Sequence, residues 1–184
     1  MKNLNWILII VFLSLYGCQE NDDGSRKFLE IQDAFIFENK QSYVIGDTIY
    51  TTLSFSRYLD EEGFDNKLDI FKSSGSDSFG YSIGLQKYSE SSETFEFLPI
   101  DSSNFFAEIG TISDLGYVTA VLNPSKTEYE SRIGIVLLES GRYKVDLLFP
   151  YLSSNGYQED RVQIDILHRF TDSSQIGFEF EVTE

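Results

Sequence analysis

The chain has 184 residues, and its 30 Asp and Glu against 14 Lys and Arg give a formal net charge of -16 at pH 7. A negative field of this size repels phosphate backbones, so nucleic acid is not an expected partner. The single cysteine, Cys18, excludes an intramolecular disulfide and a zinc site built from several thiolates.

The first predicted element is an export signal over residues 1–17. Lys2 supplies a positive charge, and the apolar run Trp6–Leu15 (WILIIVFLSL) follows it. A run of about ten residues has the size of a signal-peptide hydrophobic region, and as a helix it would reach only roughly 15 Å. Because the hydrocarbon layer is about twice as thick, we expect a cleaved signal rather than a membrane span.

A lipid-attachment motif follows at the end of the signal. Leu15, Tyr16, Gly17 and Cys18 resemble the lipobox of bacterial lipoproteins, whose cysteine becomes the acylated N-terminus of the mature chain. The resemblance implies lipidation of Cys18 and a membrane anchor. Each buried methylene contributes about 0.8 kcal/mol, so two or more acyl chains hold a protein stably. The alternative is an ordinary signal peptide beside an unrelated cysteine.

Residues 18–27 are predicted to be an acidic tether, because Gln19–Ser25 (QENDDGS) is polar and has too few apolar residues to fold. An acidic stretch directly after the cysteine resembles the surface-export signals of Bacteroidota lipoproteins. That resemblance implies an outer-membrane protein displayed on the cell surface, with the periplasmic leaflet as the alternative.

Residues 28–184 are predicted to form one all-β domain. Phe178–Val182, Tyr143–Leu147 and Val162–Ile166 alternate apolar and polar residues, which is the pattern of a strand with one buried face. Clusters of Gly, Asn, Asp and Ser separate the segments and favour a sandwich or barrel. Further strands are expected at 28–37, 48–55, 78–87, 94–98, 105–109, 117–122 and 132–138.

Two short motifs narrow the expected architecture. Gly141–Val145 (GRYKV) resembles the G-x-Y-x-V entry to strand F of immunoglobulin-like domains, in which the tyrosine hydroxyl bonds back to the backbone as a tyrosine corner. Gly46–Ile49 (GDTI) resembles the opening of an early strand in the same class of bacterial surface domains. These resemblances imply an immunoglobulin-like β-sandwich, with another sandwich or a small β-barrel as the alternatives.

No catalytic residue is predicted. His168 shares the parity of Val162, Ile164 and Ile166, and no serine stands in a G-x-S-x-G elbow, so a histidine-based triad is not expected. A glycan hydrolase with two carboxylates stays open as an alternative. Its local candidates are Glu93 with Glu96, Glu128 with Glu130, and Glu159 with Asp160.

The densest group of side-chain oxygens lies in the loop at residues 60–69. Calcium takes six to eight oxygen ligands from a flexible loop, and Asp60, Glu62, Asp65 and Asp69 are the candidate metal ligands. The loop lacks the register of an EF-hand, and Lys67 opposes a cation. A solvated loop is therefore the alternative.

The candidate ligand-binding residues are four tyrosines predicted to lie in loops: Tyr58, Tyr88, Tyr151 and Tyr157. Exposed aromatic rings stack on the apolar faces of sugar rings, while carboxylates and amides bind sugar hydroxyls. Tyr151 and Tyr157 flank the turn Ser153–Gly156 and are expected to form a rim.

These observations predict a lipid-anchored extracytoplasmic binding module that is not an enzyme. Its loops are expected to present a surface to a glycan or to an envelope protein. The alternatives are a carboxylate-dependent glycan hydrolase and a structural accessory subunit of an envelope complex.

Overall fold

A computed structural model describes residues 26–38, 40, 42–100, 103–156, 160–172 and 175–184. Cys18 and Tyr157, two residues of the sequence predictions, lie outside this range. The described residues confirm an all-β domain with one short helix. Its elements are β1 (Arg26–Gln32), β2 (Phe35–Phe37), β3 (Tyr43–Val44), β4 (Thr48–Ser56), β5 (Tyr58–Leu59), β6 (Leu68–Asp69), α2 (Ile70–Ser74), β7 (Ser78–Ser89), β8 (Thr94–Phe97), β9 (Phe105–Ile109), β10 (Thr111–Ile112), β11 (Tyr117–Leu122), β12 (Glu128–Val136), β13 (Gly141–Leu147), β14 (Tyr151–Ser154), β15 (Gln163–Arg169) and β16 (Phe178–Thr183).

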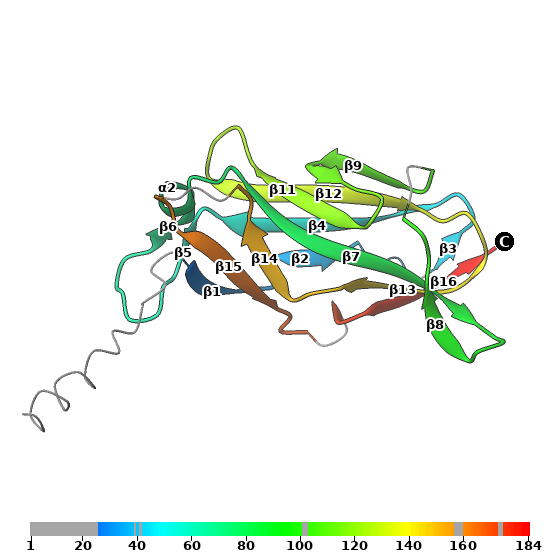
Figure 1. The fold of residues 1–184 in the computed structure, drawn as a ribbon. Helices are drawn as coiled ribbons and strands as arrows, with labels where there is room; N and C mark the ends of the chain where they lie inside the picture. The colour runs from blue at the N-terminus through cyan, green and yellow to red at the C-terminus, as the bar shows by residue number, and fades with distance from the viewer. Residues whose placement is uncertain (1–25, 39, 41, 101–102, 157–159, 173–174) are drawn as a thin grey trace, which may run out of the picture.

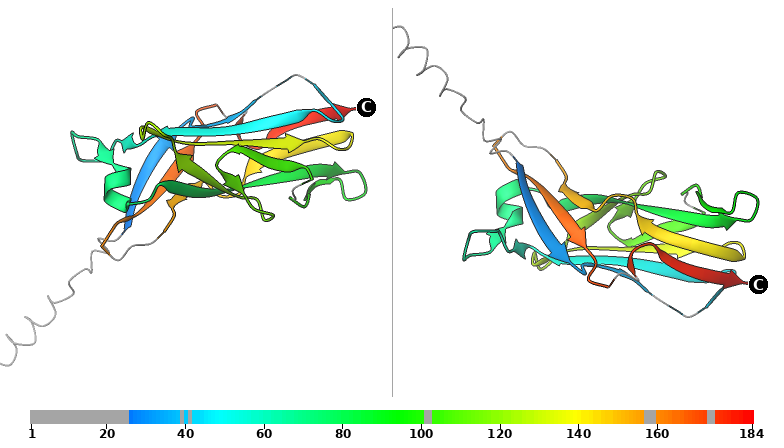
Figure 2. Two further views of the ribbon diagram at one scale, coloured as in Figure 1. Left: turned by 90° about the horizontal axis from the view of Figure 1, so that it is seen from above. Right: turned by 90° about the horizontal axis from the view of Figure 1, so that it is seen from below.

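Most strands belong to one large mixed sheet, ordered β1-β15-β14-β7-β11-β12-β4-β2. The long strand β7 links its two parts. Its first half pairs with β11 and β14, and its second half pairs with β13 and β8. Most pairs are antiparallel, but β1 runs parallel to β15, and β3 runs parallel to β16. The long strands β4, β7 and β12 extend along the domain, and the sheet curls around its core (Figures 1 and 2).

The core consists of the apolar side chains that strand alternation turns inward. In β7 these are Phe79, Tyr81, Ile83 and Leu85, all buried, whereas the intervening positions are small or polar. In β16, Phe178, Phe180 and Val182 are buried and the two glutamates are exposed, as the sequence predicts. Burial of side chains of this size contributes about 1.5–3 kcal/mol each.

The predicted tyrosine corner is present at the start of β13. The Tyr143 hydroxyl donates a hydrogen bond to the carbonyl oxygen of Glu139 at 2.9 Å, and its ring stacks on Phe180 at 5.7 Å between centroids. This bond satisfies a hydroxyl that the packing would otherwise leave buried without a partner. The Tyr43 hydroxyl likewise donates to the carbonyl oxygen of Glu38, five residues before it, at 2.7 Å.

The predicted single strand at 28–37 is wrong, because the chain turns sharply at Asp33. Asp33 adopts a φ of 50°, and its carboxylate accepts a hydrogen bond from the backbone N–H of Thr171 at 2.8 Å. Asparagine and aspartate tolerate this left-handed conformation better than most residues. The turn moves the chain from its pairing with β15 to a pairing with β4. Strand β1 also begins at Arg26, which shortens the tether predicted to end at residue 27.

Candidate ligand-binding groove

A groove of about 540 Å³ lies on the outer face of the sheet, across the adjacent strands β1, β15, β14, β7 and β11. The register places one residue from each of β1, β15, β14 and β7 in a row. Phe28 pairs with Asp165, Asp165 with Ser153, and Ser153 with Gly80. The residues between them, such as Leu29 and Ile164, face the core. The groove therefore belongs to the sheet itself, and these strands are neighbours in Figure 1.

Four aromatic rings surround the groove and remain accessible to solvent. The exposed fractions are 66% for Phe28, 65% for Phe149, 46% for Tyr151 and 42% for Tyr117. Phe149 comes from the connection between β13 and β14, and the other three come from strands. Large rings held at this exposure offer apolar faces to a ligand.

Gly80 forms part of the groove floor and allows a tyrosine ring to lie across β7. A Cβ atom built on Gly80 would lie 1.6 Å from the Tyr117 hydroxyl oxygen, so no other residue fits beneath this ring. The Tyr117 hydroxyl donates a hydrogen bond to Oδ1 of Asn155 at 2.7 Å, which fixes the ring in this position. The groove therefore has this shape only because residue 80 is a glycine.

A buried carboxylate, Asp165, lies at the floor of the groove, where it is 2% exposed. Its Oδ1 accepts a hydrogen bond from the Ser153 hydroxyl at 2.6 Å, and its Oδ2 accepts one from Nε of Arg26. The hydrogen bond with Asp165 and the charge of this carboxylate raise the pKa of the Arg26 guanidinium. Arg26 thus stays charged, and the buried carboxylate has the paired partner that such a charge requires.

Arg26 also packs on the first aromatic ring of the groove. Its Cζ lies 5.4 Å from the centroid of Phe28, which is within the range of a cation–π contact. Strand alternation places Arg26 and Phe28 on the same face of β1. The guanidinium is therefore held from two directions, by Asp165 and by Phe28.

His168 is a structural residue of the core, as its strand parity suggested. Its Nε2 accepts a hydrogen bond from the backbone N–H of Phe35 at 3.2 Å, and its ring packs at 4.5 Å from that of Phe170. Burial lowers the pKa of His168, against a smaller opposing effect of the Asp33 carboxylate. A neutral histidine that accepts at Nε2 carries its proton on Nδ1.

The candidate calcium ligands are found in a loop that forms ion pairs of its own. Asp60 pairs with Lys67, their carboxylate and ammonium atoms being 3.1 Å apart, and Glu62 and Asp65 are exposed. Within the described residues, no three His, Cys, Asp or Glu side chains lie close enough together to hold a metal ion. The calcium prediction therefore does not enter the proposed function.

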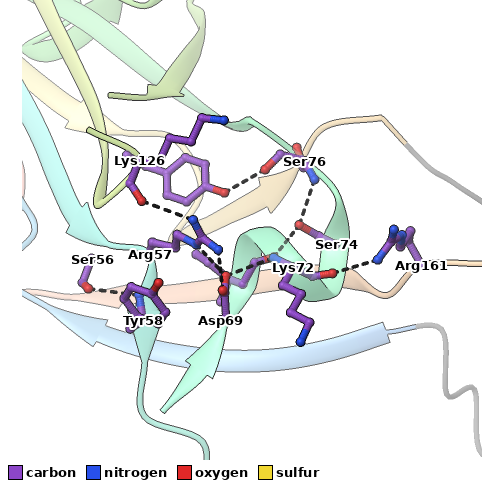
Figure 3. A network of polar contacts seen from close by, with 11 residues as sticks. Ser56, Arg57, Tyr58, Asp69, Lys72, Ser74, Ser76, Lys126 and Arg161 are labelled. Carbon is purple, nitrogen blue, oxygen red and sulfur yellow. Dashed lines mark hydrogen bonds and ion pairs between the residues drawn. The ribbon is translucent and has the colours of Figure 1, made fainter. Parts of the chain in front are cut away.

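Asp69, the fourth candidate, has two other partners (Figure 3). Its Oδ1 accepts hydrogen bonds from Nε of Arg57 at 2.7 Å and from the backbone N–H of Lys72 at 3.0 Å. The second bond caps the N-terminus of helix α2. The hydrogen bond from Arg57 is the main cause that lowers the pKa of Asp69. This side chain thus joins the β4–β5 connection, β6 and α2 in one corner of the domain.

The structure separates the predicted tyrosines, and the three that it describes lie in strands β5, β7 and β14 rather than in loops. Tyr151 lines the groove, whereas Tyr58 borders a different, more polar cleft together with Asp60 and Lys67. Tyr88 lies at the end of β7, where it packs against Phe95 and Arg142. The structure therefore places only Tyr151, among the three described tyrosines, in the groove.

The hydrolase candidates Glu93, Glu96, Glu128, Glu130 and Asp160 also lie outside the groove, and Glu159 lies outside the described residues. Glu96 accepts a hydrogen bond from the Ser92 hydroxyl at 2.6 Å in the β7–β8 hairpin. Glu130 accepts one from Nδ2 of Asn123 at 3.0 Å beside β12. Among the described residues that line the groove, the one carboxylate is Asp165.

Sequence reasoning missed most of the groove. Phe28 and Asp165 stand at strand positions that the pattern assigned to a core or a solvated face, and Phe149 precedes a proline in a connection. The available signal was the run of small residues on the outer face of β7, Gly80, Ser82 and Gly84, which is unusual for a central strand. Such a run indicates that other groups lie close to the backbone.

In comparisons with known proteins, no family model matches the chain, and no curated protein matches it either. The described residues also contain no helix that is both long enough and apolar enough to cross a membrane.

Proposed function

We propose that this protein is a non-catalytic glycan-binding module and that its ligand occupies the groove on β1, β15, β14, β7 and β11. The observation that carries the proposal is the set of four exposed rings around a floor of hydrogen-bonding groups. Sugars present apolar C–H faces and polar hydroxyl edges, so they match rings on the walls and polar atoms below. The volume of about 540 Å³ falls within the range of ordinary ligand pockets.

The chemistry of Asp165 favours binding over hydrolysis. Glycoside hydrolysis generally uses two carboxyl groups about 5–9.5 Å apart across the scissile bond. Both oxygens of Asp165 already accept hydrogen bonds, one from Ser153 and one from Arg26. Because both oxygens already accept hydrogen bonds, Asp165 holds Ser153 and Arg26 in position and is not suited to transfer a proton to a ligand.

The proposed setting of this module is the cell surface. The lipobox-like segment ending at Cys18 supports acylation and an outer-membrane anchor, and the acidic residues after it support export to the exterior. The tyrosine corner at Tyr143 supports an immunoglobulin-like sandwich as the scaffold. Metabolic labelling with a fatty acid, compared between the natural chain and a Cys18→Ser variant, tests the anchor directly.

Glycan binding is tested by titrating the full chain, purified in detergent, with oligosaccharides selected on a glycan array. Removal of a stacked ring forfeits about 1.5–3 kcal/mol of burial, which corresponds to at least a tenfold loss of affinity. We expect this loss for Phe28→Ala and Phe149→Ala. The matched control is Phe64→Ala, because Phe64 is 67% exposed and lies outside the groove. An equal loss in all three variants, or no binding by the natural chain, would refute the proposal.

A further inference from the structure

The remaining hydrogen-bonding capacity of Arg26 points to the kind of sugar that the groove takes. Asp165 uses Nε of the guanidinium, and Phe28 supports its Cζ from the side. Among the described residues, the two terminal nitrogens have no hydrogen-bond partner. Arginine normally uses such a free edge for bidentate contacts with a planar oxyanion.

The floor carboxylate cannot take the equivalent role toward a cationic sugar. Only 2% of the surface of Asp165 is exposed, and each of its carboxylate oxygens already accepts a hydrogen bond. An ammonium group of a ligand would have to displace Arg26 from this pair. The charged lining group that a ligand can reach is therefore the Arg26 guanidinium, although its pair with Asp165 is neutral overall and the protein as a whole is acidic.

Two described acidic residues in or beside β1 are themselves paired. Glu30 pairs with Arg169, their side-chain atoms being 2.8 Å apart, and Glu61 pairs with Lys27. Charges farther away are screened over a Debye length of about 8 Å at physiological ionic strength. At hydrogen-bonding distance from the Arg26 terminal nitrogens, an anionic group thus interacts more strongly with Arg26 than with the net charge of the chain, even though Asp165 offsets part of the Arg26 field.

We infer that the groove binds an acidic glycan, with the carboxylate of a uronic acid paired to the terminal nitrogens of Arg26. The aromatic rings then stack on the same sugar or on its neighbours. Asp165 is a positioning residue in this arrangement, because it orients Arg26 and does not contact the ligand's charge. The inference rests on the proposed glycan-binding function and adds the class of sugar.

The test compares two ligands that differ only at the carboxyl group, which is charged in one and methyl-esterified in the other. Oligogalacturonide as the free acid and as its methyl ester share one backbone, and the ester removes the negative charge. We expect the full chain to bind the free acid at least tenfold more tightly, since a hydrogen-bonded charge pair is lost with the ester. Glucuronan oligomers in the same two forms extend the comparison to a second uronic acid.

Variants of Arg26 locate this preference. Arg26→Gln should abolish the difference between acid and ester, and Arg26→Lys should retain part of it because the charge remains. The matched control is Arg169→Gln, which removes a similarly exposed, ion-paired arginine outside the groove and should leave the preference unchanged. Thermal unfolding of each variant shows whether Asp165, left without its partner, destabilises the fold. If Arg26→Gln does not fold, the acid and ester comparison on the natural chain still decides.

The possible outcomes separate the inference from the proposed function. Equal affinity for acid and ester, with binding still sensitive to Phe28→Ala, would overturn the acidic-sugar inference and leave glycan binding intact. Binding of sulfated galactan in place of both uronates would also overturn the assignment to a carboxylate. If neither uronates nor any neutral or sulfated glycan binds, the proposed function itself fails.

Discussion

Replacing Gly80 by alanine tests whether the ring of Tyr117 shapes the groove. The new Cβ would lie 1.6 Å from the hydroxyl oxygen and 2.3 Å from Cζ of Tyr117, and the three nearest atoms all belong to this side chain. The ring must therefore leave β7 and give up its hydrogen bond to Asn155. Gly80→Ala is expected to weaken ligand binding by removing one wall of the groove.

The energetic effect is best isolated by a double-mutant cycle. Overpacking costs about 1–3 kcal/mol, and Tyr117 can relieve part of it by moving into solvent. Alanine also restricts the unfolded chain, which stabilises by about 0.4–1 kcal/mol and partly hides the clash. In a Tyr117→Ala background the new Cβ has no ring to clash with, so only the restriction of the unfolded chain remains. We therefore expect a coupling free energy of about 1–2 kcal/mol between the two substitutions.

Urea denaturation of the four proteins in the cycle measures this coupling. The control is Gly84→Ala, on the same face of the same strand, whose nearest atoms belong to Leu148 and Phe97. Its effect should be the same with and without Tyr117. A Gly80→Ala cost that is equal in both backgrounds would refute the role assigned to the ring.

Three further predictions concern the core and the helix cap. Tyr143→Phe removes the bond to the Glu139 carbonyl and should lower the free energy of unfolding by about 0.5–1.5 kcal/mol in chemical denaturation, whereas Tyr88→Phe should have little effect. Because burial depresses the pKa of His168 in the folded state, the unfolded chain takes up its proton first. The contribution of His168 to stability should therefore be complete above about pH 6.5 and decrease as the pH falls below it, by at most about 1.4 kcal/mol per unit. Denaturation at pH 5.5 and 7.5 should show a smaller difference in His168→Gln than in the natural chain. Asp69→Ala removes the cap of α2 and the Arg57 pair, so we expect a loss of about 1–2 kcal/mol, while Asp65→Ala in the same loop should change stability little.

The sequence predicts a strand well where one face of the strand is buried and the other faces solvent. Phe178, Phe180 and Val182 face the core and their neighbours face solvent, because β16 has one buried face. The GRYKV motif likewise predicts the bond of Tyr143, since that contact is local in the chain. The β1–β2 break was missed because Asp33 is stabilised by Thr171, which is far away in the sequence.

The groove escaped prediction for the same reason. Asp165 occupies a polar position in an alternating strand, and only the pairing of β15 with both β1 and β14 brings Arg26 and Ser153 to it. Phe28 shares the parity of Glu30 and Gln32 on the outer face of β1, but an aromatic residue in a strand was not considered as a ligand-binding residue. Tyr151 was predicted to be exposed and lines the groove, although it lies in strand β14 and not in a loop.

Chemical-shift mapping of the full chain during titration with an oligogalacturonide tests the central claim most directly. Glycan binding in the groove predicts that the largest amide shifts fall on the floor and walls, at Gly80, Ser82, Ser153 and Asp165, with the side-chain signal of Arg26 moving in parallel. Shifts concentrated instead around Tyr58 and Lys67, in the separate polar cleft, would contradict it.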